Sequence, residues 1–272
     1  MSQQSVKEKV KETDLKPQVY KDPRPAEFFD RYHAKARGGI GFIYDVVRVI
    51  LTPLTILLYR ARAIGVENVP SSGPVIVTPN HFSQMDHFFA AVYLRRKVQF
   101  MAKSQLFSNG FVKWVFYHGG VFPVRRGYDD KEAFTTAHTV LGRDGAVLMY
   151  AEGGRSRSGD LGTPKRGVGK LALESGAPVV PVAIHGSLGV RAWKRLHMPK
   201  VTIQYGEPLT FPVKQNPTRE EQQRVAEQVF DHVRAMYVDL EENGRASVLR
   251  RIREGLPAGS PEPDPASARS RS

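Results

Sequence analysis

Short apolar runs alternate with amphipathic segments through the middle of the chain. The apolar runs predict strands at residues 74–77, 98–102, 121–124, 146–150, 178–184 and 201–205, the last at an edge of the sheet. Helical spacing of apolar residues predicts helices at 88–94, 106–117, 131–141 and 168–174. Strands that alternate with helices predict an α/β fold, in which helices flank a mixed, largely parallel central sheet.

A long amphipathic helix is expected after the last strand, over residues 219–242. The capping box Thr218 to Glu221 marks its start, and Gly244 lies just beyond its end. Its apolar stripe predicts packing against the core and consists of Val225, Val229, Phe230, Val233, Met236, Tyr237 and Leu240.

Residues 40–59 form the most hydrophobic stretch of the chain, which Asp45, Arg48 and Pro53 interrupt. At about 100° per residue, its polar side chains fall on one narrow stripe within about 80° of one another. These are Asp45, Arg48, Thr52, Thr55 and Tyr59. The internal charges argue against a full membrane span. Two alternatives remain: a helix lying in the membrane interface, or a helix packed on its own domain with the polar stripe facing solvent.

We expect four parts in the chain. Residues 1–38 have mixed charge and no signal-peptide pattern, and predict a mobile N-terminal arm. Residues 39–62 are expected to form the membrane-associating amphipathic helix, and residues 63–244 the domain that performs the chemistry. Residues 245–272 predict a basic segment and a disordered tail, because the Pro, Ser and Gly content after residue 257 disfavours a core.

Charge and cysteine content narrow the classes of function. The formal net charge is +13, from 40 Lys and Arg against 27 Asp and Glu, which favours nucleic acid, phosphorylated metabolites or an acidic membrane as partners. The chain has no Cys, which excludes disulfides, thiolate catalysis and Cys-bound metals.

His81 and Asp86 stand five residues apart at the junction between a predicted strand and a predicted helix. On one continuous helix they would point about 140° apart. They meet only if His81 precedes the helix and Asp86 lies in its first turn, where the carboxylate fixes the tautomer and leaves the other ring nitrogen as a base. The alternative is structural: Asp86 caps the helix and His81 satisfies a turn.

Cationic residues follow several predicted strands. Arg125 and Arg126 come directly after one strand, and Arg155 lies in the glycine-rich loop 150–159 after another. Guanidinium groups suit phosphate, and glycines let the backbone approach a ligand closely. Lys103 extends the same basic rim, so these loops predict an anion site.

Four blocks, in order, resemble those of the 1-acylglycerol-3-phosphate acyltransferases and related glycerolipid acyltransferases. They are the His-x4-Asp pattern of His81 and Asp86, the segment Gly120 to Arg125, the segment Tyr150 to Ser156, and the segment Ala177 to Val182. The third block is usually Phe-Pro-Glu-Gly-Thr-Arg-Ser, so Ala151 and Gly154 depart from the pattern. The resemblance covers roughly residues 60 to 210.

This resemblance implies an acyltransferase that converts 1-acylglycerol-3-phosphate to phosphatidic acid, with acyl-CoA or acyl carrier protein as co-substrate. His81 is then the base, Asp86 orients it, and no metal or further cofactor is expected. The expected phosphate-binding residues are Arg125, Glu152, Gly153, Arg155 and Ser156, with Lys103, Arg126 and Pro181 as auxiliary residues. We expect Ser83 not to be a nucleophile, and His87 and His185 to be structural.

The expected partners are a lysolipid, an acyl thioester and an anionic membrane surface, without nucleic acid. The expected location is the cytoplasmic face of the cell membrane, as a peripheral or monotopic protein. Two alternatives stay open: an acyltransferase for another lysophospholipid or a glycolipid, and a non-enzymatic basic module that binds membrane or nucleic acid through its charge.

Overall fold

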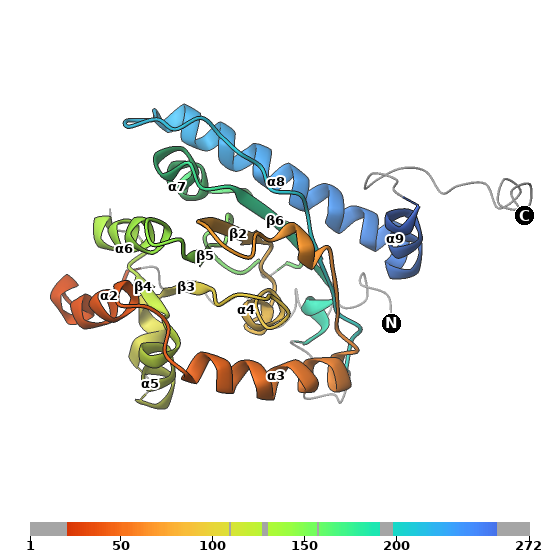
Figure 1. The fold of residues 1–272 in the computed structure, drawn as a ribbon, viewed down its shortest axis with the longest axis horizontal. Coiled ribbons are helices and arrows are strands. Elements are labelled where there is room, and N and C mark those ends of the chain that lie inside the picture. The colour runs from red at the N-terminus through yellow and green to blue at the C-terminus, as the bar shows by residue number, and fades with distance from the viewer. Residues whose placement is uncertain (1–20, 109, 127–129, 157, 191–197, 255–272) are drawn as a thin grey trace, which may run out of the picture.

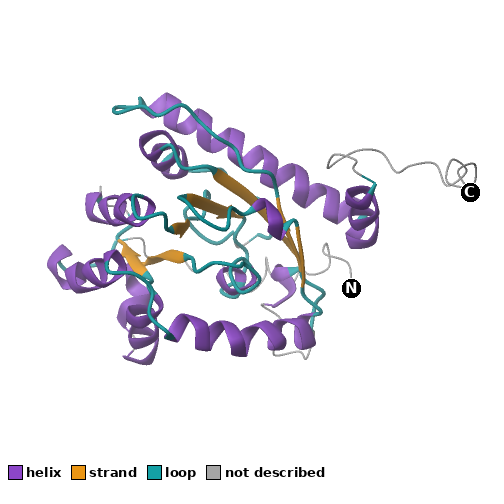
Figure 2. Ribbon diagram, viewed as in Figure 1, coloured by secondary structure: helices purple, strands orange, loops and turns teal. Residues whose placement is uncertain are grey.

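The computed structural model describes residues 21–254, except 109, 127–129, 157 and 191–197. A seven-stranded sheet lies at its centre, in the order β1-β7-β6-β2-β5-β3-β4 (Figures 1 and 2). The strands are β1 Arg62–Ile64, β2 Val75–Pro79, β3 Gln99–Lys103, β4 Phe122–Val124, β5 Ala146–Leu148, β6 Val179–His185 and β7 Thr202–Tyr205. Neighbours pair in parallel except β6 and β7, which are antiparallel. The predicted mixed, largely parallel sheet is confirmed.

Both faces of the sheet are buried, which explains why its central strands are apolar throughout. In β2, Ile76 points into the cluster formed with α6, α7 and α8. Its neighbours Val75 and Val77 point to the opposite cluster, with Phe89 and Leu94. This alternation is the two-residue period of a strand with helices on both sides.

Helices α6 Lys131–Leu141, α7 Gly167–Ser175 and α8 Arg219–Glu242 cover one face (Figure 1). Helix α7 ends at Gly176, whose φ of 67° lies in the left-handed region. The capping box of Thr218 and Glu221 opens α8, and the whole predicted apolar stripe of this helix is buried. Both predictions for α8, the capping box and the buried stripe, are confirmed.

The other side holds α3 Ile43–Tyr59, the short α4 Asp86–Phe89, the 3-10 helix η3 Ser104–Ser108 and α5 Gly110–Gly119. In Figure 1, α3 and α5 lie next to each other along one side of the molecule, and the two helices are in contact. Helix α4 is shorter than the predicted helix over 88–94, because the chain continues in turns after Phe89.

Helix α3 packs on the domain with its polar face, unlike most amphipathic helices, which pack with their apolar face. Its polar side chains face the protein: Arg48 donates to the Leu94 carbonyl (3.2 Å), and Thr55 hydrogen-bonds the Tyr93 hydroxyl (2.7 Å). The apolar side chains face outward, and 71% of Val49 and 75% of Leu57 is exposed. The interpretation in which the polar stripe faces solvent is therefore wrong. Nowhere in the described ranges is a helix both long enough and apolar enough to cross a bilayer.

Two sequence-based expectations need correction. The strand at 201–205 is not at an edge, because β1 pairs with β7 on its outer side. The sequence did not predict β1, since three residues give too short an alternation to detect. Helix α9, Gly244–Arg253, lies at the start of the predicted basic segment, and it buries Val248 and Arg251, the latter paired with Asp239. Residues 255–272, which include the predicted disordered tail, lie outside the described residues.

The second correction concerns the predicted mobile arm. The 3-10 helix η1 Ala26–Phe29 and helix α2 Asp30–Arg37 pack on the domain, with Phe29, Tyr32 and Ala36 buried. Aromatic residues spaced along this segment supply the apolar area that docks it. Residues 1–20 of the predicted arm lie outside the described part.

Candidate active site

The candidate site lies at the carboxyl ends of the parallel strands. Strand β2 ends at Pro79 and leads to His81, and its parallel neighbour β5 ends at Leu148 and leads to Tyr150 and Glu152. Because parallel neighbours end at the same edge, the two loops lie together there, which is the usual place for sites in such sheets. The Asn80 side chain fixes the first loop through two hydrogen bonds to the backbone of Ile184.

His81 and Asp86 are joined by a hydrogen bond of 3.0 Å between Nδ1 and Oδ2. His81 precedes α4 and Asp86 is its first residue, which is the arrangement that the spacing requires. The same carboxylate oxygen accepts the backbone N–H groups of Phe82 (2.6 Å) and Ser83 (2.7 Å). Asp86 therefore holds the turn and the imidazole at once, so the two alternatives for this residue are not exclusive.

The hydrogen bond to Asp86 sets the tautomer of His81. A carboxylate oxygen only accepts, so Nδ1 carries the proton and Nε2 has a free lone pair. Burial lowers the pKa of His81; Asp86 opposes this effect, and Arg155 and Arg126 add to it. A neutral imidazole with a free Nε2 is a general base.

Glu152 connects the loop that carries His81 to its own loop after β5. Its Oε1 accepts the backbone N–H of His81 (2.8 Å) and its Oε2 accepts that of Gly162 (2.8 Å). Burial raises the pKa of Glu152 to about 7, while these two amides lower it. The Glu152 side chain therefore holds the two loops together through their backbone N–H groups.

Tyr150 and His87 complete the surroundings of His81. The Tyr150 ring stacks on the His81 ring, with centroids 3.8 Å apart and planes inclined by 18°. The Tyr150 hydroxyl lies 3.3 Å from Nδ1 of His87. Asp86 holds one edge of the imidazole at Nδ1, and the stacked Tyr150 ring covers one of its faces, so both limit rotation of the His81 ring.

A cavity of about 470 Å³ borders His81. Its walls are mainly apolar and come from α3, α4, β3 and α5, with Val47, Phe88, Ala91, Phe100 and Val115 among them. Lys103, Arg126 and Arg155 add cationic groups to the lining. One space thus offers a base, an apolar wall and positive charge.

The predicted phosphate-binding residues fall into different places. Arg155, with the auxiliary residues Lys103 and Arg126, lines the cavity together with His81, whereas Arg125 does not. The Arg125 guanidinium donates to the Arg24 carbonyl (2.9 Å). Its backbone N–H donates to Asp130 (2.6 Å). Whether each of these residues binds phosphate stays a prediction.

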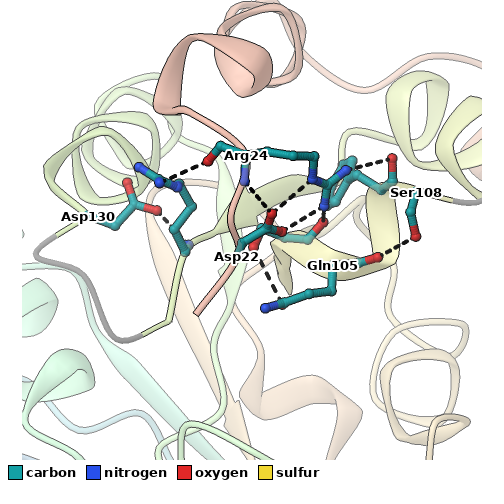
Figure 3. Close-up of polar contacts among 8 residues, drawn as sticks. Asp22, Arg24, Gln105, Ser108 and Asp130 are labelled. Atoms are coloured by element: carbon teal, nitrogen blue, oxygen red, sulfur yellow. Dashed lines mark hydrogen bonds and ion pairs between the residues drawn. The ribbon is translucent and has the colours of Figure 1, made fainter. Parts of the chain in front are cut away.

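The N-terminal segment around Arg24 connects Arg125 with η3. Arg24 pairs with the buried Asp22 (2.6 Å) and donates to the carbonyl of Ser104 (2.8 Å), as Figure 3 shows for the surrounding network. The Arg24 side chain thereby connects the segment to η3, while its carbonyl holds Arg125. Sequence reasoning missed this contact, because the pairing residues are about 80 and 100 positions apart.

The other named residues lie around the site or away from it. Gly153 has a φ of 66° in the turn after Tyr150, and the Ser156 N–H donates to the His81 carbonyl (2.9 Å). Pro181 is buried in the middle of β6, opposite Thr78 of β2, and does not line the cavity. Ser83 is buried, and its hydroxyl accepts the Met85 N–H (3.2 Å).

The sequence did not single out Tyr150 as a site residue and assigned His87 a structural place. One signal was available for Tyr150: it directly precedes Ala151 and Glu152 in the third block, at the carboxyl end of a strand. Within the described ranges, no group of three or more His, Asp or Glu side chains is placed to hold a metal.

Replacing Glu152 by Gln should change how stability depends on pH. The folded-state pKa of about 7 lies above the ordinary glutamate value of 4.5, so the folded state keeps a proton that the unfolded state releases between these values. The raised pKa of Glu152 therefore contributes its full stabilisation of the folded state below pH 4.5, and this stabilisation is lost as the pH rises through 7. We expect the free energy of unfolding of the wild type, relative to Glu152→Gln, to fall by about 3 kcal/mol over this range in urea titrations. A difference that does not vary with pH would contradict the burial of this carboxyl group.

Comparison with known proteins links this geometry to a family. The sequence pattern of the Acyltransferase family matches residues 60–185. A 1-acyl-sn-glycerol-3-phosphate acyltransferase of Brassica napus is 27% identical over 162 residues, which are 58% of this chain and 45% of that protein. One from Borreliella burgdorferi is 30% identical over 125 residues, or 45% of this chain and 50% of that protein.

The chain spans about half the length of the curated relatives that it matches. Among solved structures, the 1-acyl-sn-glycerophosphate acyltransferase of Thermotoga maritima is similar in fold, with a TM-score of 0.56 and 23% identity. That similarity covers 75% of this chain and 84% of the other. The matched region contains both strand-end loops of the site, so residues 60–185 are similar over this site to the Acyltransferase family and to relatives named 1-acyl-sn-glycerol-3-phosphate acyltransferase.

Proposed function

We propose that this protein transfers a fatty acyl group from acyl-CoA or acyl carrier protein to the free hydroxyl of 1-acylglycerol-3-phosphate, giving phosphatidic acid. The observation that supports this most is the hydrogen-bonded His81 and Asp86 beside a cavity that is both apolar and cationic. The names of the relatives point to the same acceptor.

In this mechanism Nε2 of His81 takes the proton from the acceptor hydroxyl as its oxygen attacks the thioester carbonyl carbon. Asp86 stabilises the imidazolium that forms, as an acceptor of its Nδ1–H. The carbon–sulfur bond then breaks, and the imidazolium returns the proton to the leaving thiolate. The ester and the free thiol are the products, and no acyl-enzyme forms.

The cations of the cavity are suited to the phosphate of the acceptor. Arg155 and Arg126 lie close enough to His81 to lower its pKa through their charge. A phosphate held by them is therefore near the base, which turns the encounter of hydroxyl and thioester into an oriented one. Lys103 adds a third charge from the end of β3. Arg125 acts from outside the cavity by holding the N-terminal segment.

The apolar part of the cavity is suited to a fatty acyl chain. It extends from His81 along α4, to Ala91 and Val92, and is closed by the inner side of α3. Burying methylene groups there contributes about 0.8 kcal/mol each, without any polar contact. An acyl chain in this space places its carbonyl end toward His81.

The outward apolar face of α3 supports binding to a membrane surface, with the protein peripheral or monotopic on the cytoplasmic face of the cell membrane. Helix α5, in contact with α3, adds Phe111 and Trp114, of which 75% and 49% are exposed. Exposed apolar patches of this kind on a monomer mark interaction sites, and a wide apolar face on a helix fits the lipid interface. The net charge of +13 favours anionic lipids.

A second acceptor class follows from the third block. Gly154 lacks the threonine hydroxyl that the related pattern has, and Ala151 lacks the proline. One contact to the acceptor is thereby absent. We therefore include another lysophospholipid or a glycolipid hydroxyl as the alternative acceptor, to be tested with a panel of acceptors and both thioester donors.

Substitution of His81 or Asp86 should abolish most of the activity. We expect His81→Ala and Asp86→Asn to lower kcat for transfer to lysophosphatidic acid by about 10²- to 10⁴-fold, the usual range for a lost general base. Thiol release from acyl-CoA measures the rate. His232→Ala, on the exposed side of α8, is the matched control. A folded His81→Ala protein with wild-type turnover would remove the base assignment.

Substitution of Arg155 should affect the acceptor more than the donor. We expect Arg155→Ala to raise the KM for lysophosphatidic acid by about 10- to 100-fold, since a hydrogen bond to a charged group contributes about 1.5–3 kcal/mol. The KM for monoacylglycerol, which lacks phosphate, should change little. Arg224→Ala on α8 is the control. A loss that is equal for both acceptors would show that Arg155 does not bind phosphate.

Charges on the outer side of α3 should prevent membrane binding. We expect Val49→Asp with Leu57→Asp to lower binding to vesicles of phosphatidylglycerol and phosphatidylethanolamine by more than about tenfold, because each apolar side chain contributes about 1.5–3 kcal/mol when buried. Val213→Asp, at a residue that is 64% exposed away from α3, is the control. Flotation of the double variant equal to that of the wild type would exclude this face.

A further inference from the structure

His87 and Tyr150 line the cavity beside His81, yet the mechanism above uses neither. His87 directly follows Asp86 in α4, and Tyr150 follows β5. The His87 ring centroid is 6.0 Å from that of His81, and the Tyr150 ring lies against His81 at 3.8 Å. Both side chains therefore line the cavity next to the base.

The hydrogen bond between His87 Nδ1 and the Tyr150 hydroxyl, 3.3 Å long, has two proton arrangements. If Tyr150 donates, the neutral imidazole carries its proton on Nε2, which is then a donor directed away from the pair. If Nδ1–H donates, the hydroxyl proton of Tyr150 is the remaining donor. Either arrangement leaves one donor for a ligand. Among the described residues, neither Nε2 of His87 nor the hydroxyl has another hydrogen-bond partner.

The surroundings keep His87 uncharged. Its ring contacts those of Phe88 and Phe100, and burial lowers the pKa of His87 to about 4, with the charge of His81 opposing protonation as well. A neutral donor does not repel the imidazolium that His81 becomes when it accepts a proton. In an apolar cavity a donor of this kind stabilises developing negative charge more strongly than in water.

We propose that His87 and Tyr150 form the donor that binds the thioester carbonyl oxygen and stabilises the oxyanion of the tetrahedral intermediate. This proposal rests on the proposed acyl transfer. The pair gains and loses no proton: the carbon–oxygen bond forms, the carbon–sulfur bond breaks, and the proton travels from the acceptor hydroxyl through His81 to the thiolate. The related block usually has phenylalanine at the position of Tyr150, so the hydroxyl is a departure from that pattern.

The test compares His87→Leu, Tyr150→Phe and the double variant, with acyl-CoA and acceptor both saturating. The double variant removes every donor, and we expect it to lower kcat by about 10²- to 10³-fold, as for loss of an oxyanion donor. Because a transition-state contact is lost, kcat and kcat/KM should fall equally. The single variant with the larger loss of kcat identifies which of the two groups, His87 or Tyr150, donates the hydrogen bond to the oxyanion.

His87→Gln is the conservative variant, since its amide N–H replaces Nε2–H. If His87 is the donor, it should retain at least about ten times the kcat of His87→Leu, which keeps the volume but not the donor. Thermal unfolding checks each fold, and His232→Leu on α8 is the control for loss of an imidazole. If the double variant does not fold, the sum of the losses in the two single variants takes its place.

Two outcomes separate this proposal from the proposed function. A wild-type protein without His81-dependent transfer to any acceptor overturns both. An active wild type whose folded double variant keeps kcat within about threefold overturns the oxyanion role alone, and shows that His87 and Tyr150 only pack against His81.

Discussion

The parallel pairing of β2 with β5 is the constraint on which the site depends. It places two chain segments that are 71 residues apart in the sequence at the same edge of the sheet, so that the His81 loop and the Glu152 loop are neighbours. The Glu152 carboxylate then converts proximity into a fixed distance by accepting the backbone N–H of His81. A slip in this register would move His81 away from Glu152, and also from Tyr150, whose ring limits its rotation.

Asp86 shows how one oxygen serves the fold and the chemistry together. Its Oδ2 accepts two backbone amides and the imidazole, and the residue is completely buried. Three donors stabilise a charge that burial alone would disfavour. The turn that orients His81 is thus held by the same atom that would stabilise the imidazolium in the proposed transfer. Substitutions of this residue therefore act on geometry and electrostatics at once, and a fold check is needed beside any activity measurement.

Much of the sheet, and the pairing of His81 with Asp86, could be predicted from the sequence, because local periodicity and spacing determine them. The alternation of strands and helices is visible in apolar runs, and the five-residue spacing allows only one arrangement in which the two side chains meet. Contacts between distant segments could not be predicted in this way. The position of Arg125 against Arg24, and the insertion of β7 between β1 and β6, depend on tertiary pairing that leaves no local pattern.

The orientation of α3 is another feature that local sequence patterns do not determine, and it has a physical cause. Periodicity identifies a polar stripe on one side of the helix, but the direction of that stripe depends on what its groups can bind. Helix α4 is so short that the carbonyls of Val92 and Leu94 are not used within a helix, and Thr52 and Arg48 donate to them. Satisfying these polar groups turns the stripe inward and leaves the apolar side exposed. One side of α3 lines the cavity and the other side exposes its apolar residues, so the cavity wall and the outer apolar face are two consequences of one orientation.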